Sequence, residues 1–272
     1  MGGGEMGGIV SPLPPRERGE YGTFGRAALP LAVGLARGLD RSTRRLIVTA
    51  GRVRRLAETR GWPVVLSERE LAALQALASE KRRRDWLAGR LAAKLLVART
   101  LAPALGTLLP LRDIEIGYDT DGAPRFTVAG RPGLESGWSI SIAHCAAHGA
   151  CAMAQTGRTA RVGVDLERAR ELRPELHRYF LSAGERRRLG ESPTGGPITP
   201  LALWTVKEAV IKAAPRHTRR SMRNVYLSWD ETGRVSPAIA GPAARGVRVA
   251  AACERRGAWL LAYATCRPPE EG

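Results

Sequence analysis

The stretch Arg161-Val162-Gly163-Val164-Asp165-Leu166-Glu167 predicts a strand with one apolar and one acidic face, and the rest of the fold is predicted from it. In an extended strand the side chains alternate between two faces, so the three apolar residues point one way while Gly163, Asp165 and Glu167 point the other. Carboxylates at positions i and i+2 lie about 6.5 Å apart along a strand. They repel each other unless a hard divalent cation lies between them. The alternative is an edge strand with a solvated polar face, so the motif needs a partner elsewhere.

A second run, Leu203 to Ala213, contains neither Gly nor Pro and is predicted to be a helix. Glu208 and Lys212 are neighbours on it at i and i+4, and such a pair is often a plain surface ion pair. Trp204 shares the face of Glu208, and a large aromatic residue favours a face turned toward the protein interior. Glu208 and Lys212 are then expected at the rim of a cleft, where a third carboxylate joins the two of the acidic strand.

At their spacing these two stretches resemble the 4′-phosphopantetheinyl transferase superfamily, in the surfactin-synthetase-activating-like type that has both halves in one chain. Two further segments fit the family. The segment from Trp86 to Leu95 resembles its first-half helix, and the segment from Ser139 to Cys145 resembles its central strand ending in Ser-His. The resemblance spans about Leu66 to Ala264, and four ordered motifs are more specific than any one of them.

The resemblance implies a magnesium-dependent enzyme, a holo-[acyl-carrier-protein] synthase. It would transfer 4′-phosphopantetheine from coenzyme A to a serine of an apo acyl or peptidyl carrier protein and release adenosine 3′,5′-bisphosphate. Asp165, Glu167 and Glu208 are the implied ligands of Mg²⁺. Glu208, or a metal-bound water that it orients, is the candidate base for the serine hydroxyl. Lys212 is expected to stabilise charge on the transferring phosphate.

Four basic residues are candidates for binding coenzyme A. Arg90 and Lys94 lie at i and i+4 on the polar side of a predicted helix, where they are either separately solvated or a clamp for phosphates. His144 ends a predicted strand and is either a partly exposed strand-end residue or a donor to a phosphate. The resemblance favours the binding role for these three and adds Lys212.

Two positions depart from the family pattern. Gly122-Ala123-Pro124 stands where family members commonly have Gly-Lys-Pro, so a lysine expected to meet a ligand phosphate is absent, and Arg125 is the candidate replacement. Ala143 stands where the family often has Ser, which removes a hydroxyl donor.

The 272 residues include 43 Lys and Arg against 26 Asp and Glu, a formal net charge of +17. This charge favours an anionic partner such as nucleic acid, a polyphosphate ligand or an acidic protein, although the excess of Arg over Lys is also typical of a GC-rich genome. Carrier proteins are generally acidic around the modified serine, and Arg216, Arg219 and Arg220 are expected to steer them.

The alternative function is a basic nucleic-acid-binding module without catalysis, built on the run from Lys81 to Arg84. Only 5% of the residues are aromatic, and none interleave with basic runs as stacking platforms would. That alternative also leaves the three carboxylates unexplained, so no nucleic-acid partner is expected.

The sequence also suggests a location. The four cysteines form no C-x-x-C pair, so neither a zinc site nor a disulfide framework is expected, and a reducing cytoplasm fits. The apolar segment from Ala27 to Leu39 is interrupted by Arg37 and is too short to span a bilayer, so no export signal or membrane association is predicted. A chain with both halves is expected to work as a monomer.

The expected fold is α+β, with two pseudo-twofold-related lobes, each with helices packed on a small antiparallel sheet, and the ligand site between them. Residues 1–40 are expected to be a disordered N-terminal extension, 41–155 the first lobe, 156–267 the second lobe with the metal site, and 268–272 a frayed tail. No sequence repeat between the lobes is apparent.

Hydrophobic alternation and turn residues predict the individual elements. Ser67 is expected to cap a helix, and residues 113–128 are expected to form a hairpin. The strand at 151–155 is expected to pair with the acidic strand. Further strands are predicted at 46–50 and 138–144, with three antiparallel strands at 225–229, 246–253 and 259–265.

Overall fold

A computed structural model describes residues 43–59, 61–156, 161–191, 198–215 and 221–267. The predicted N-terminal extension 1–40 and the predicted tail 268–272 lie outside the described residues. So do Arg216, Arg219 and Arg220. Within the described ranges, no helix is both long and apolar enough to cross a membrane.

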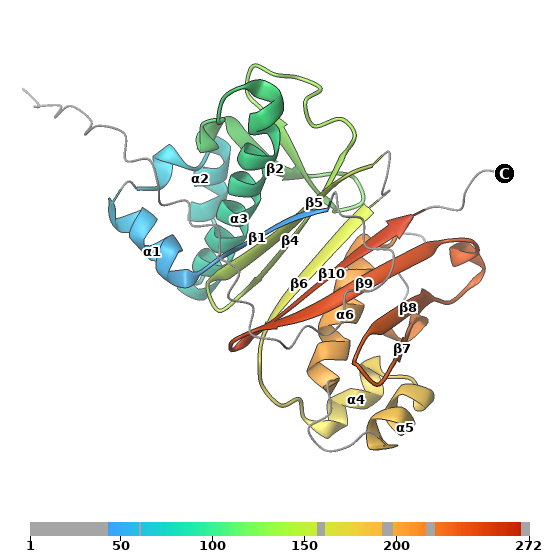
Figure 1. Ribbon diagram of the computed structural model, residues 1–272. Helices are drawn as coiled ribbons and strands as arrows, with labels where there is room; N and C mark the ends of the chain where they lie inside the picture. The colour runs from blue at the N-terminus through green and yellow to red at the C-terminus, as the bar shows by residue number, and fades with distance from the viewer. Residues whose placement is uncertain (1–42, 60, 157–160, 192–197, 216–220, 268–272) are drawn as a thin grey trace, which may run out of the picture. The chain divides into compact units, whose positions relative to one another are not determined.

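The chain forms two consecutive sets of elements in similar order (Figure 1). The first set comprises β1 (Arg44–Val48), α1 (Ala50–Thr59), α2 (Glu68–Gln75), α3 (Glu80–Leu105), β2 (Ile114–Tyr118), β3 (Pro124–Val128), β4 (Trp138–Cys145) and β5 (His148–Gln155). The second set comprises β6 (Arg161–Arg168), α4 (Pro174–Phe180), α5 (Ala183–Glu191), α6 (Pro200–Ala213), β7 (Val225–Trp229), β8 (Val235–Ile239), β9 (Arg248–Arg256) and β10 (Trp259–Arg267).

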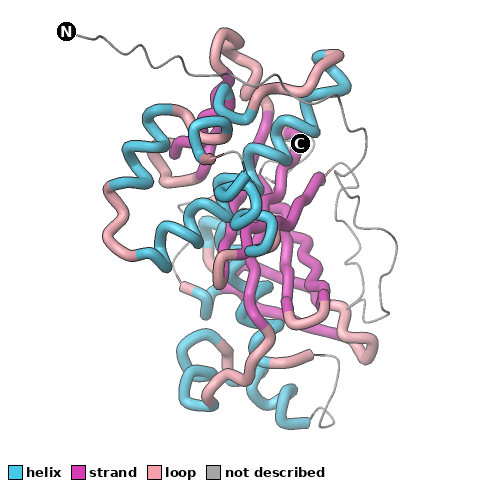
Figure 2. The backbone as a smooth tube through the Cα atoms, turned by 90° about the vertical axis from the view of Figure 1, so that its left-hand side faces the viewer, coloured by secondary structure: helices cyan, strands magenta, loops and turns pink. Residues whose placement is uncertain are grey.

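The strand order is the same in both sets. Antiparallel sheets are formed in the order β1-β5-β4 and β6-β10-β9, and the pairs β2-β3 and β7-β8 form separate hairpins. Helix α3 packs on the first sheet and α6 on the second, and the side view shows strands gathered together with helices beside them (Figure 2). The predicted α+β class, with helices on small antiparallel sheets, is confirmed.

The acidic strand β6 does not pair with β5, contrary to the prediction. It pairs with β10 instead, because both edges of β5 are already occupied by β1 and β4. Strand β6 also lies beside β4. The two strands are not paired in a sheet, and serine side chains of β4 bond the backbone of β6 instead. The Ser139 hydroxyl accepts a 3.1 Å hydrogen bond from the N–H of Val162. The Ser141 hydroxyl accepts one of 3.0 Å from the N–H of Val164. The two sheets therefore meet at the strand that carries the candidate metal ligands.

Two other differences from the predicted elements concern the edges of the sheets. Residues 225–229 form β7, which pairs with β8 in its own hairpin and not with the later strands; the third strand of that later sheet is β6. Ala50, predicted as the last residue of a strand, instead begins the helix α1, and no element was predicted for residues 51–59.

A buried ion pair is repeated in the two halves. In the first half, Ser67 caps α2 as predicted and forms a capping box with Glu70 there. The Glu70 carboxylate accepts the N–H of Ile116 at 3.1 Å and is paired with the ammonium of Lys94, which also donates to the carbonyl of Val65 at 2.8 Å. This arrangement ties α2, α3 and β2 together.

In the second half, Ser182 and Glu185 form the same reciprocal bonds at the start of α5. Glu185 accepts the N–H of Leu227 at 2.8 Å and pairs with Lys207 at 2.8 Å, and Lys207 donates to the carbonyl of Phe180 at 2.7 Å. Each lysine thus bonds the carbonyl two residues before the capping serine. The sequence Leu-Ser-x-x-Glu at 66–70 and 181–185 is the trace of this repeat.

Candidate active site

The acidic face of β6 lies directly against helix α6. Gly163 allows this approach, because a Cβ atom at this position would lie 1.9 Å from the carbonyl oxygen of Ala209 and 2.7 Å from the amide nitrogen of Ala213. Glycine is the residue that permits such close backbone contact. The acidic strand and its predicted helical partner therefore meet as expected, with Glu208 and Lys212 carried on α6.

Asp165 lies in the seam between β6 and α6 and is 8% exposed. Its Oδ1 atom accepts a 2.7 Å hydrogen bond from Lys212, which also donates to the carbonyl of Val164 at 3.1 Å. The Oδ2 atom is buried and has no hydrogen-bond partner among the described residues. A buried carboxylate oxygen without a partner costs free energy, and a cation is one group that satisfies it.

Glu167 and Glu208 are both half-buried near Asp165. Burial raises the pKa of Glu167, and the charge of Asp165 raises it further. Burial also raises the pKa of Glu208; Lys212 opposes that shift, while Asp165 and Glu167 add to it. The three carboxylates therefore repel one another across the seam.

The predicted metal site is not preassembled. Within the described ranges, no group of three or more His, Cys, Asp or Glu side chains is gathered closely enough to hold a metal ion. The chemistry of the three carboxylates nevertheless suits a hard divalent cation, because they supply only oxygen ligands and their mutual repulsion would be relieved by positive charge. Asp165, Glu167 and Glu208 remain the candidate ligands.

A pocket of about 220 Å³ adjoins this acidic group. Its walls come from α3, β4 and the turn between β2 and β3 in the first half, and from β6 and α6 in the second. Lys212 belongs to both sites, since it lines the pocket and bonds Asp165. The other basic side chains in the lining are Arg90, His144 and Arg161.

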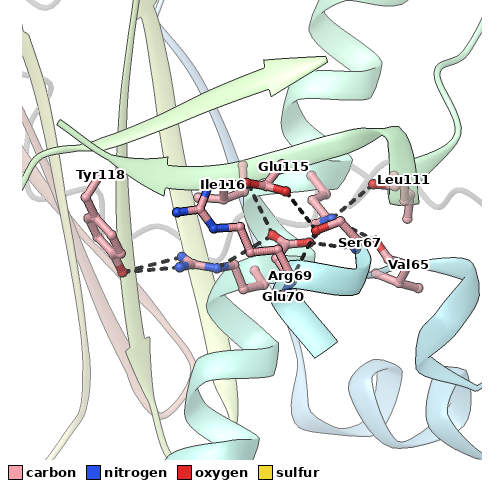
Figure 3. Close-up of polar contacts among 10 residues, drawn as sticks. Val65, Ser67, Arg69, Glu70, Leu111, Glu115, Ile116 and Tyr118 are labelled. Carbon is pink, nitrogen blue, oxygen red and sulfur yellow. Dashed lines mark hydrogen bonds and ion pairs between the residues drawn. The ribbon is translucent and has the colours of Figure 1, made fainter. Parts of the chain in front are cut away.

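Arg90 is held in place at the pocket wall. Its side chain is buried, and the guanidinium carbon lies 4.7 Å from the centroid of the Trp86 ring and 5.3 Å from that of Tyr118. The guanidinium donates to the hydroxyl of Tyr118 at 3.4 and 3.5 Å (Figure 3), and Nε lies 3.8 Å from Glu70. Cation–π contacts and an ion pair fix the orientation of the fork. Arg90 thus lies at the pocket wall, and its contact with a phosphate of coenzyme A stays a prediction.

Lys94 does not lie at the candidate site, which corrects the prediction of a clamp with Arg90. Its side chain is 0% exposed. The ammonium group donates to the carbonyls of Val65 and Leu111, at 2.8 and 3.1 Å, and is paired with Glu70, whose surroundings Figure 3 shows. Because an ammonium has three N–H donors, these three acceptors leave none for a ligand.

His144 reaches the pocket from the end of β4. Loss of contact with water lowers the pKa of its imidazole. The negative charge of Asp85 acts to raise this pKa, and the positive charge of Lys212 lowers it further. The shift favours the neutral ring, which still has one N–H to donate.

The turn after His144 has a strained backbone. Ala146 and Ala147 form the two-residue connection between β4 and β5 and have φ angles of 47° and 61°, a conformation that favours Gly or Asn. Asp85 on α3 accepts the N–H of Ala147 at 2.6 Å and an i,i+4 bond from Lys81 at 3.0 Å. Burial alone would raise the pKa of Asp85, but these bonds lower it. The ionised carboxylate therefore holds the turn that follows His144.

We expect Ala147→Gly to stabilise the fold by about 0.5–1 kcal/mol, because glycine removes the cost of a positive φ but gains entropy in the unfolded chain. Urea unfolding monitored by circular dichroism measures the change. The matched control is Ala129→Gly, at an exposed turn residue that does not have a positive φ. An equal or lower stability for Ala147→Gly than for this control would contradict the prediction.

The two departures from the family pattern have different surroundings. Ala123 lines the pocket, but Arg125 is not its replacement, because Arg125 pairs with Asp119 at 3.3 Å and is absent from the described residues of the lining. Ala143 is buried in the core with Val164 and Tyr263 and is likewise absent from that lining. Ser139 and Ser141 supply the hydroxyls of this wall.

Arg161 was not predicted from the sequence as a site residue. It lines the pocket at the start of β6. A signal was present, because positions 161, 163 and 165 share one face of a strand, so the residue two before Gly163 belongs to the same face as Asp165. What the sequence could not show is that this end of β6 faces a turn of the first half.

Comparison with known proteins identifies the family of the chain. Residues 161–262 match the model of the 4′-phosphopantetheinyl transferase superfamily. The chain is similar to the holo-[acyl-carrier-protein] synthase of Bacillus subtilis, with 39% identity over 88 residues that cover 32% of this chain and 68% of the relative. It is also similar to the synthase of that name from Anoxybacillus flavithermus, with 35% identity over 80 residues that cover 29% of this chain and 63% of the relative.

A solved structure is also similar: a holo-(acyl-carrier-protein) synthase from Bacillus anthracis in complex with CoA (3′,5′-ADP). It has a TM-score of 0.33 and 22% identity, and the match covers 41% of this chain and 92% of that one. An acidic strand against a helix beside a basic pocket is an arrangement suited to an enzyme that acts on phosphate esters. The chain belongs to the 4′-phosphopantetheinyl transferase superfamily and is an enzyme of that transferase class.

Proposed function

We propose that this chain transfers 4′-phosphopantetheine from coenzyme A to a serine of an apo acyl or peptidyl carrier protein. The reaction depends on Mg²⁺ and releases adenosine 3′,5′-bisphosphate. The main support is the 2.7 Å contact between Lys212 and Asp165, because it joins a basic pocket to the acidic strand. The relatives named holo-[acyl-carrier-protein] synthase support the same substrate class.

The pocket accounts for binding of a polyanion. Pockets for whole ligands of drug size or larger usually occupy about 300–1,000 Å³, so about 220 Å³ holds only part of coenzyme A. Arg90 offers to a phosphate the N–H donors that Tyr118 does not use, His144 offers one N–H, and Lys212 supplies a point charge. The pantetheine arm then extends out of the pocket toward the carrier protein.

Asp165, Glu167 and Glu208 would hold the magnesium ion. The unpartnered Oδ2 of Asp165 and the raised pKa values of the two glutamates support this assignment, since each feature is relieved by a bound cation. When bound, the ion would neutralise the pyrophosphate charge that otherwise repels the attacking oxygen.

Glu208 is the proposed general base. A carboxylate whose pKa lies above its usual value accepts a proton more readily. Glu208 takes the proton of the serine hydroxyl, the serine Oγ forms a bond to the phosphorus that bears pantetheine, and the bond from that phosphorus to the oxygen of adenosine 3′,5′-bisphosphate breaks. Lys212 stabilises charge on the transferring phosphate.

The pocket also supports activity as a monomer, and the cytoplasm is the proposed location because the four cysteines include no C-x-x-C pair. Residues of both halves line it, including Arg90 on α3 and Lys212 on α6, so a single copy of the chain supplies every wall described above. Size-exclusion chromatography with light scattering checks the monomer.

Labelling of a carrier protein tests the proposed function. Apo acyl carrier protein and an apo peptidyl carrier domain are incubated with the enzyme, Mg²⁺ and fluorescent coenzyme A. We expect label on the carrier serine, no label on a carrier with that serine replaced by alanine, and none in excess EDTA. If neither carrier is labelled, while a DNA oligonucleotide gives a salt-sensitive rise in melting temperature and coenzyme A gives none, the proposal is wrong and the nucleic-acid alternative is favoured.

A further inference from the structure

His144 lies at the end of a hairpin that packs closely on helix α3. A Cβ atom at Gly149 would lie 2.0 Å from the carbonyl oxygen of Ala88, and one at Gly89 would lie 3.5 Å from Cδ2 of the His144 ring. Glycine permits such close approach. Asp85 lies four residues before Gly89 and therefore on the same face of α3. A carboxylate thus stands on the helix face that meets the hairpin.

The turn between β4 and β5 is held in its conformation from outside. Ala146 and Ala147 both have positive φ angles, which cost about 1–2 kcal/mol per residue other than glycine. A strained backbone persists where the surrounding structure fixes it, and such sites are often functional. Asp85 fixes this turn from the side of α3, through the N–H of Ala147. From the second half, the Trp259 ring lies against His148, the residue after the turn, with ring centroids 4.0 Å apart.

The Asp85 side chain is buried although it is charged. The residue is 5% exposed, and taking a carboxylate out of water costs several kcal/mol unless its oxygens are bonded. Oδ1 accepts the N–H of Ala147 at 2.6 Å, and Oδ2 accepts a bond from Lys81 at 3.0 Å. Asp85 is not among the described residues of the pocket lining, whereas His144 is. Asp85 therefore acts on a ligand through the hairpin end that carries His144.

We propose that Asp85 is a positioning residue for His144: by holding the strained turn, it keeps the imidazole directed into the pocket. This inference rests on the proposed function for the contact between His144 and a phosphate. Without the carboxylate, the N–H of Ala147 loses its acceptor and the turn relaxes toward negative φ angles. The imidazole then loses its place, although no group that touches the ligand has been changed.

A double-mutant cycle in the labelling assay tests the inference. We expect Asp85→Ala and His144→Ala each to raise the KM for coenzyme A about 10-fold or more, the usual effect of losing a hydrogen bond to a charged group, with a smaller change in kcat. The double variant should have the same KM as His144→Ala, because both changes remove one contact. Glu80→Ala, which removes an exposed carboxylate from the same helix, should leave the KM unchanged.

A rescue experiment separates positioning from a general loss of structure. Ala147→Gly in the Asp85→Ala background should restore most of the lost affinity for coenzyme A, because glycine adopts a positive φ without a hold. Asp85→Asn keeps an oxygen that accepts the N–H of the turn, so its KM should lie between those of the wild type and Asp85→Ala.

Nuclear magnetic resonance of the His144 ring gives a readout without catalysis. Burial lowers the pKa of the ring, while the charge of Asp85 acts to raise it and those of Lys212 and Lys81 act to lower it. Asp85→Asn should therefore lower the pKa of His144, and Glu80→Gln should not. The ring resonances should move in Asp85→Ala and return toward their wild-type positions when Ala147→Gly is added.

Three results would overturn the inference: an unchanged KM for Asp85→Ala, a further full rise in KM when Asp85→Ala is added to His144→Ala, or no recovery with Ala147→Gly. If the wild type labels no carrier, the proposed function fails, and the ring resonances of His144 still decide whether Asp85 positions it. If Asp85→Ala does not fold, Asp85→Asn takes its place in the cycle and in the rescue.

Discussion

Asp165→Asn is expected to reduce carrier labelling by about 10³-fold or more at any magnesium concentration, because a metal contributes several kcal/mol to transition-state stabilisation. Asparagine keeps the size of the side chain but removes the charge that makes this site attractive to a cation. It also removes the 2.7 Å ion pair that fixes Lys212 at the pocket. Both losses act on the reaction and not on the hydrophobic core.

Controls separate the loss of charge at the site from a general loss of charge. Glu171→Gln removes a carboxylate at an exposed position just beyond the end of β6 and should label carrier at the wild-type rate. Thermal unfolding should show that Asp165→Asn is folded, and Mg²⁺ with coenzyme A should raise the melting temperature of the wild type more than that of the variant. Labelling by Asp165→Asn within tenfold of the wild type would refute the metal assignment.

Lys207→Met is expected to lower the free energy of unfolding by about 3–5 kcal/mol, because it leaves Glu185 as a buried charge without its partner. Lys207 is 0% exposed and donates to Glu185 and to the carbonyls of Phe180 and Met222. Burial lowers the pKa of Lys207, while Glu185 acts in the opposite direction. Lys207 precedes the candidate site residue Glu208 in the sequence, but its ammonium group is buried and binds Glu185 and two backbone carbonyls.

Denaturant unfolding measures this effect. The control Arg187→Met, at an exposed position two residues after Glu185 in α5, should change stability by less than about 0.5 kcal/mol. The double variant Glu185→Gln/Lys207→Met should lose less than Lys207→Met alone, since neither charge is then buried unpaired. A loss below about 1 kcal/mol for Lys207→Met would show that the lysine does not have this structural role.

Local chemistry made several features predictable from the sequence. The period-two pattern of 161–167 fixes a strand with an acidic face, and the run from 203 to 213 fixes a helix. The Ser67 capping box depends on residues three apart, so it is readable without a tertiary structure. The family resemblance, now confirmed by the match over residues 161–262, followed from the same short motifs.

Tertiary structure decided which side chains face the pocket, because that depends on elements far apart in the chain. Arg90 and Lys94 look alike as an i,i+4 pair, but only Arg90 lines the pocket, since the carboxylate of Glu70 and the carbonyls of Val65 and Leu111 surround Lys94. The partner of β6 is also a tertiary outcome, fixed by the occupied edges of β5. Arg161 lines the pocket only because β6 meets the turn of another hairpin.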